Sequence, residues 1–141
     1  MQIIGKFQFI VLILIFCLTN QVELYISFII FAIIHEMGHL LIGILIGKKI
    51  EKIRVMPLGV SITFKILVED YNKKIIKGNI NNIKNLLVAI AGPFVNFAIA
   101  IILYNLSSLN ILSFKYTEII IYINLLIGFF NLIPIYPLDG G

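Results

Sequence analysis

The stretch AIIHEMGHLLIGIL, residues 32–45, holds three ionisable side chains within five positions of an apolar run. These are His35, Glu36 and His39, and the two histidines are the only two in the chain. A run this apolar belongs in a membrane or in a protein core, where a charged group is costly. The presence of the three side chains therefore needs an explanation, and that explanation decides how the rest of the chain is interpreted.

The composition indicates a membrane protein. Of the 141 residues, 60% are hydrophobic and 13% are charged, and the mean hydropathy is +1.07. A soluble domain has about 25% charged residues. The length allows one domain. Cys17 is the only cysteine, which excludes an internal disulfide, so nothing points to an oxidising compartment.

Four apolar segments predict an all-α polytopic membrane protein, a bundle of about four transmembrane helices. They cover residues 7–18, 24–47, 86–106 and 116–133. The first is short against a hydrocarbon core of about 30 Å, so it either spans with its flanking residues or forms a hairpin with the second. We expect it to be retained rather than cleaved as a signal peptide, because no small-residue cleavage site follows it.

Residues 48–85, between the second and third segments, are basic and polar. Nine of the 11 basic residues lie here with three acids, so the positive-inside rule places this loop in the cytoplasm. VSITFKI (60–66) alternates apolar and polar residues, and MPLG (56–59) is a turn signal. We predict a short β-hairpin within 50–66, with an ordered loop as the alternative. Residues 70–85 are typical of a polar, partly helical linker.

The spacing of the two histidines suits a metal ion. On a helix, His35 and His39 lie on one face, so their imidazoles can converge on one ion. Glu36 points about 100° away from His35, where it can reach a water on the metal rather than the metal itself. This is the chemistry of H-E-x-x-H, two zinc ligands and a general base. Packing alone is a weak alternative, because a charged residue in mid-membrane costs about 2.5–3.5 kcal/mol.

A catalytic zinc site needs a third protein ligand. Cys17 is a poor candidate, because the short first segment carries no accompanying pattern. Asp139 lies in NLIPIYPLDGG (131–141), where two prolines break the fourth segment. A broken helix at membrane depth lines a cavity or is buried in protein, so this aspartate could approach the histidines. The alternative is a surface turn. The other carboxylates lie near segment ends or in loops: Glu23, Glu51, Glu69, Asp70 and Glu118.

These motifs together resemble the site-2 protease family of intramembrane zinc metalloproteases, peptidase family M50. That family carries H-E-x-x-H in one core helix and N-x-x-P-x-x-x-L-D-G in another, matched by HEMGH (35–39) and NLIPIYPLDG (131–140). Its intervening helix often carries G-P-x-x-N, matched within AGPFVNF (91–97). The RVMPLGVSITF region (54–64), the short first segment and the compact loop resemble the sporulation-type branch, which releases a membrane-tethered sigma-factor precursor.

The resemblance implies a role for each matching residue. His35, His39 and Asp139 would bind Zn²⁺, and Glu36 would be the general base. Asn96 and Asn131 would position substrate or stabilise an oxyanion. The implied protein is a multi-pass endopeptidase of a bacterial cell membrane. Its partners would be the lipid bilayer, a membrane-tethered protein substrate and regulatory membrane proteins, with no nucleic acid.

The chain stops two residues after Asp139, whereas family members continue. We therefore expect residues 1–141 to be a single intramembrane metalloprotease core, truncated after the third ligand. Two other classes of protein stay open. One is a transporter component whose His, Glu and Asp relay protons or metal, and the other is an inactive homologue that only binds membrane helices. Zinc content and substitutions of Glu36 discriminate between them.

Overall fold

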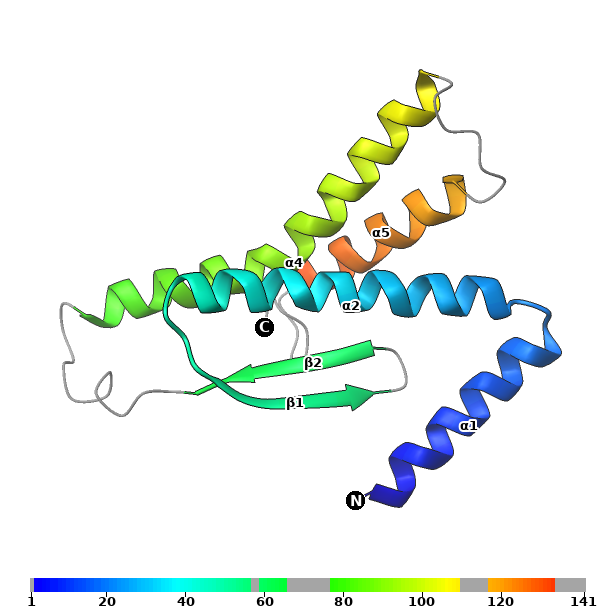
Figure 1. Ribbon diagram of the computed structural model, residues 1–141, viewed down its shortest axis with the longest axis horizontal. Coiled ribbons are helices and arrows are strands. Elements are labelled where there is room, and N and C mark those ends of the chain that lie inside the picture. The colour runs from blue at the N-terminus through cyan, green and yellow to red at the C-terminus, as the bar shows by residue number, and fades with distance from the viewer. Residues whose placement is uncertain (1, 57–58, 66–76, 110–116, 134–141) are drawn as a thin grey trace.

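The computed structural model describes residues 2–56, 59–65, 77–109 and 117–133, which form four helices and one β-hairpin (Figure 1). The helices are α1 (Gln2–Leu18), α2 (Val22–Leu45), α4 (Lys77–Ser108) and α5 (Thr117–Leu132). The strands are β1 (Ile50–Met56) and β2 (Gly59–Phe64). The four predicted segments are thus helical, and the predicted hairpin is present. Part of the predicted turn, part of the linker and the PLDGG motif lie outside the described residues.

A glycine ends α2 and turns the chain back along it. Gly47 has a φ of +79°, a left-handed conformation that residues with a Cβ rarely adopt. Its N–H donates to the carbonyl of Ile44, and the N–H of Lys48 donates to the carbonyl of Gly43, both at 2.9 Å. These bonds form a Schellman motif, which satisfies carbonyls that the helix end would leave without partners. The motif also fixes the backbone of Lys48 and starts the hairpin.

The hairpin lies beside the C-terminal half of α2 (Figure 1). β1 and β2 pair antiparallel, with Ile53 opposite Ile62. Opposed residues share a face of the sheet, so the alternation that predicted β2 gives the hairpin one apolar and one polar face. The ring of Phe64 occupies the space that a side chain at Gly43 would need, which seats β2 closely against α2.

Helix α4 begins earlier than the predicted apolar segment, because the polar residues 77–85 continue into the same helix. Pro93 lies inside it and has no N–H, so the carbonyl of Ala89 loses its helical partner. Figure 1 shows α4 bending between a part that runs beside α2 and a part that rises with α5. A proline is a usual cause of such a bend. The bend allows one helix to contact both α2 and α5.

Small residues allow α2, α4 and α5 to pack closely. A Cβ at Gly38 would lie 2.9 Å from the carbonyl oxygen of Ala91, so the backbones of α2 and α4 nearly touch. A Cβ at Gly128 of α5 would lie 3.0 Å from the ring of Phe97 on α4. Glycine at such contacts is typical of helix pairs in membranes. As a result, the histidine-bearing turns of α2 lie directly against α4.

Among the residues that the structure describes, two helical stretches have the length and hydropathy needed to cross a membrane, Val22–Leu45 and Asn82–Ser108. α5 is apolar but shorter. α1 diverges from the other helices and contacts α2 near its start, where the rings of Phe16 and Tyr25 stack with centroids 4.8 Å apart. The structure therefore confirms the part of the predicted fold class that concerns a mostly helical fold with one short β-hairpin.

Candidate metal centre

His35 and His39 lie one turn apart on the face of α2 that is packed against α4. They are 3% and 5% exposed. Their Nε2 atoms are 3.1 Å apart, and the two rings are inclined at 81° to each other. The prediction that the helical spacing makes the imidazoles converge is borne out by this geometry.

The other ring nitrogens bind oxygen atoms of α4. The Nδ1 of His39 donates to the carbonyl of Val88 at 2.7 Å, and the Nδ1 of His35 donates to Oδ1 of Asn96 at 3.1 Å. A carbonyl can only accept, so each Nδ1 carries a proton and each neutral imidazole presents a lone pair at Nε2. Hydrogen-bonding the second nitrogen of a ligating histidine in this way is the usual means of fixing its tautomer and orientation.

Two facing lone pairs at 3.1 Å repel unless a cation lies between them. A hydrogen bond between the two Nε2 atoms would require one buried imidazole to be protonated on both nitrogens. A metal ion between the rings would remove the repulsion, because both Nε2 lone pairs can be donated to one cation. Zinc–nitrogen bonds of 2.0–2.1 Å at a tetrahedral angle separate two ligand nitrogens by about 3.3 Å. The pair His35 and His39 therefore fits two positions of a zinc site.

Gly92 of α4 forms the floor of this site. A Cβ added to Gly92 would lie 2.6 Å from Nε2 of His35 and closer still to Nε2 of His39. Any side chain there would occupy the space in which the two nitrogens meet. In the sequence, Gly92 is only a part of the G-P-x-x-N match. The structure shows that it also has a steric role, because a side chain there would meet both histidines.

Glu36 contacts β2. Its Oε2 accepts the backbone N–H of Ile62 at 3.3 Å. Glu36 and His39 both line a cavity of about 210 Å³ between α2, β2 and α4. The carboxylate thus shares a cavity with His39, and its role as a base stays a prediction.

Asn96 lies behind His35, on the side of the ring away from Nε2. It is 0% exposed, and its Nδ2 has no hydrogen-bond partner among the described residues. Its Oδ1 accepts the Nδ1–H of His35 and so helps to orient that imidazole, a contact that the sequence did not reveal. A role for Asn96 in binding substrate stays a prediction.

Asn131 is half-buried in the last turn of α5, and its Nδ2 donates to the carbonyl of Ile127 at 3.0 Å. The described contacts do not bring it to the histidine pair, so its role in positioning substrate also stays a prediction. Asp139, the predicted third ligand, lies outside the described residues. The carbonyl of Val88 and the N–H of Ile62 were missed, because backbone groups leave no mark on the residue pattern.

The chain is similar in sequence to known proteins over most of its length. Residues 23–113 match the profile of peptidase family M50, a region that contains the histidine pair, Glu36 and Asn96. The chain is similar to a zinc metalloprotease of Methanocaldococcus jannaschii, 35% identical over 122 residues, 84% of this chain and 32% of the relative. It is also similar to stage IV sporulation protein FB of Bacillus subtilis, 27% identical over 124 residues, 88% of this chain and 40% of the relative. The chain thus spans less than half the length of these curated relatives.

Proposed function

The chain belongs to peptidase family M50, and from that membership we propose that it is the metal-binding core of a zinc-dependent intramembrane endopeptidase. One observation carries the proposal. Two buried Nε2 atoms lie 3.1 Å apart with both Nδ1 atoms directed at oxygen, and a glutamate follows the first histidine. The proposed substrate is a peptide bond in or near a transmembrane segment of a membrane-tethered protein. A sigma-factor precursor is the finer proposal, which rests on the resemblance to the sporulation branch.

His35 and His39 supply two ligands to zinc in this proposal, and Asp139 supplies the third. The role of Asp139 rests on its place in the NLIPIYPLDG motif. When bound, zinc polarises the scissile carbonyl and lowers the pKa of a bound water to about 7. The carbonyl of Val88 and the amide of Asn96 keep both Nε2 atoms directed at the metal position.

Glu36 is the proposed general base. It takes the proton from the attacking water and passes it to the leaving amine. The N–H of Ile62 holds one of its oxygens. An ionised carboxylate has about four lone-pair sites, so this bond orients the group without preventing proton transfer.

The outer edge of β2 is the proposed docking place for substrate. A substrate helix hides its carbonyls in its own hydrogen bonds, so it must unwind before hydrolysis. The N–H of Ile62 points toward Glu36 and not toward β1, and the N–H groups of alternate residues in a strand point the same way. An extended peptide that pairs along this edge would run beside Glu36.

We propose a multi-pass arrangement in a bacterial cell membrane. The lengths of Val22–Leu45 and Asn82–Ser108 support two crossings, and the apolar α5 and α1 would lie in the same bilayer. The hairpin and its basic residues would face the cytoplasm. Regulatory membrane proteins would be further partners.

Glu36→Gln tests the catalytic proposal. The full-length protein is purified with zinc, and cleavage of a membrane-tethered reporter is measured beside zinc content. We expect zinc to be retained and cleavage to fall by about 10²–10⁴-fold, the usual contribution of a general base. Glu23→Gln, in the exposed first turn of α2, is the matched control and should cleave normally. Proteolysis that survives Glu36→Gln would place the base elsewhere, and a relay would tolerate Glu36→Asp.

A further inference from the structure

Two lysines lie directly opposite each other at the open end of the β-hairpin. The N–H of Lys65 donates to the carbonyl of Lys49 at 2.8 Å. The two residues continue by one step the pairing of Ile50 with Phe64. Opposed residues share a face of the sheet, and Phe64 packs over Gly43 of α2. Because successive side chains of a strand alternate, Lys49 and Lys65 extend from the other face, and both are exposed.

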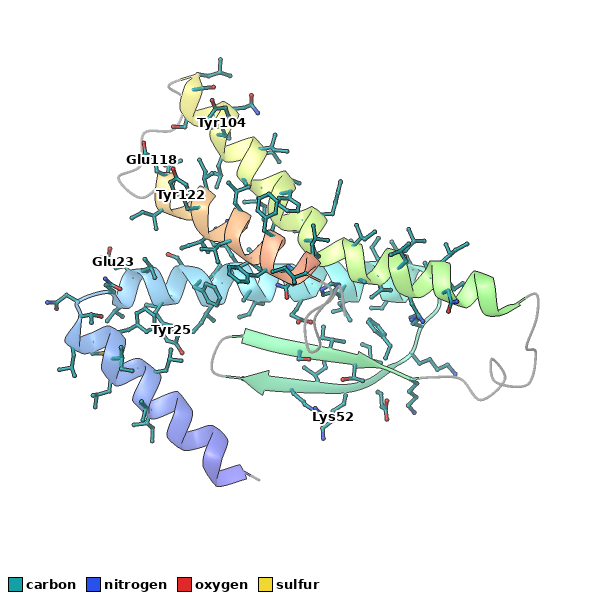
Figure 2. The ribbon with its side chains drawn as sticks, turned by 180° about the vertical axis from the view of Figure 1, so that it is seen from behind. Glu23, Tyr25, Lys52, Tyr104, Glu118 and Tyr122 are labelled. Atoms are coloured by element: carbon teal, nitrogen blue, oxygen red, sulfur yellow. The ribbon has the colours of Figure 1, made fainter. Side chains whose placement is uncertain are left out.

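A β-bulge brings a third cation to this face. The register of the pairing shifts by one residue, which makes Glu51 an extra residue in β1. In a regular strand, residues three apart extend from opposite faces, so Lys49 and Lys52 share a face only because of the bulge. Lys52 is opposite Thr63, on the face of Lys65, and it points away from the helices (Figure 2). Glu51 is the only acid in the described residues of the hairpin.

The opposed lysines favour an anion between them. Like charges directly opposite each other destabilise a strand pair. An anion that contacts both ammonium groups removes this repulsion, and each ammonium has three N–H donors to offer. A phosphate group has several acceptor oxygens, so it can accept charge-assisted hydrogen bonds from Lys49 and Lys65 together.

Apolar surface at the same end of the molecule favours an amphiphile over a soluble phosphate. Lys49 follows the last residue of α2, Leu45, by four positions, and Leu45 is 72% exposed. On the apolar face of β1, Ile53 and Val55 are 56% and 79% exposed. Acyl chains would cover such side chains, and basic residues next to the end of a membrane helix attract the anionic lipids of the cytoplasmic leaflet.

We propose that Lys49 and Lys65 bind the phosphate of an anionic phospholipid in the cytoplasmic leaflet, with Lys52 as a third cation beside it. The inference rests on the membrane arrangement proposed above and does not depend on the peptidase activity. It goes beyond the positive-inside rule, which counts basic residues in a loop and does not bring two of them together. The bound lipid would hold the open end of the hairpin at the membrane surface, next to the end of α2.

The test is lipid binding by the full-length protein in a neutral detergent, followed by native mass spectrometry during titration with phosphatidylglycerol. Phosphatidylcholine with the same acyl chains and inorganic phosphate are the comparison probes. Wild type should bind one phosphatidylglycerol with about tenfold higher affinity than phosphatidylcholine, the scale expected of two lysines near an anionic headgroup. Equal affinity for the two lipids, or displacement of phosphatidylglycerol by an equal concentration of inorganic phosphate, would overturn the inference.

Lys49→Glu should abolish the preference for phosphatidylglycerol, because the new carboxylate would pair with Lys65 across the strands. Lys65→Glu should have the same effect for the same reason, whereas Lys49→Arg should keep the preference. Arg54→Glu is the matched control, because it makes the same change in net charge on the same face, opposite Ser61 and nearer the turn. It should bind as wild type does.

Thermal unfolding of each variant shows whether the hairpin is intact, and an opposite-charge pair at 49 and 65 should not lower the melting temperature. An unchanged preference in both charge reversals, or an equal loss in Arg54→Glu, would contradict a site at the opposed lysines. Glu36→Gln should bind lipid as wild type does. Failure of the peptidase proposal would therefore appear in the cleavage assay alone, and failure of the lipid site in the titration alone.

Discussion

Three groups of α4 hold the two imidazoles: Oδ1 of Asn96 behind His35, the carbonyl of Val88 behind His39, and Gly92 where the Nε2 atoms meet. None of these three groups is proposed as a metal ligand. They determine instead where the lone pairs point. Because ligand orientation governs affinity, substitutions behind the histidines should change metal binding without removing a ligand.

Gly92→Ala should lower zinc affinity by roughly tenfold or more, the scale on which disturbed ligand orientation acts. The added methyl group would displace both Nε2 atoms, although alanine is the better helix former by about 1 kcal/mol. Competition with a zinc chelator measures the affinity. Gly128→Ala is the control, because its Cβ would meet only the edge of the Phe97 ring. Wild-type affinity in Gly92→Ala would show that α4 does not form the floor of the site.

Asn96→Ala should lower zinc affinity by about 10–100-fold, because it removes the acceptor that fixes the tautomer of His35. Asn96→Asp keeps an acceptor and should bind zinc better than Asn96→Ala. Isothermal titration with zinc after chelation gives the affinities. Asn105→Ala, in an exposed part of the same helix, should have no effect. Equal affinities for Asn96→Ala and wild type would leave Asn96 without a positioning role.

Among the elements, α2 and β2 together position Glu36, the proposed base. The glycine turn at the end of α2 sends the hairpin back along the helix, and Phe64 seats β2 over Gly43. The N–H of Ile62 then faces Glu36. Ile53 is directly opposite Ile62. Because the N–H of Ile62 points away from β1, the two residues form a non-hydrogen-bonded pair, so the N–H of Ile53 points away from β2.

Ile62→Pro should reduce cleavage by about tenfold or more while zinc stays bound. The substitution removes the N–H that orients Glu36 and interrupts the edge offered to substrate, but it takes no bond from the β1–β2 ladder. Ile53→Pro is the matched control on the outer edge of β1, and it should cleave at the wild-type rate. Reporter cleavage and zinc content are measured together. Equal losses in the two variants would mean that only the fold of the hairpin matters.

The sequence predicted elements better than it predicted contacts between them. The length of the apolar runs located the helices, and the alternation of apolar and polar residues around Ile62 located β2. The linker 70–85 was predicted to be partly helical, and its residues 77–85 are helical, but their continuity with the apolar segment in one helix was not predicted, because these residues are polar. The convergence of His35 and His39 was predictable, because H-E-x-x-H fixes their relative positions on one helix. The contacts that Val88, Gly92 and Asn96 of α4 make with the histidines were not predictable, because they depend on how α2 and α4 cross.

In the whole molecule, the candidate centre lies where α2, α4 and the hairpin meet, away from the rising end of the α4–α5 pair. Figure 2 shows Tyr104, Glu118 and Tyr122 together at that far end and Lys52 on the outer side of the hairpin. In the multi-pass arrangement that we propose, these two ends would face opposite sides of a membrane, because the hairpin region is basic and α4 is long enough to cross.

Cysteine labelling in intact cells tests this arrangement. Single cysteines are introduced as Lys52→Cys and Glu118→Cys in a Cys17→Ser background, and a membrane-impermeant maleimide is added before or after permeabilisation. Both positions are exposed, so neither is protected by packing. Glu118→Cys should react in intact cells, and Lys52→Cys should react only once the membrane is opened, because the basic loop is retained on the cytoplasmic side. Cys17→Ser alone sets the background. Labelling of both cysteines from outside would place the hairpin and the far end of α5 on one face and would remove α4 as a crossing helix.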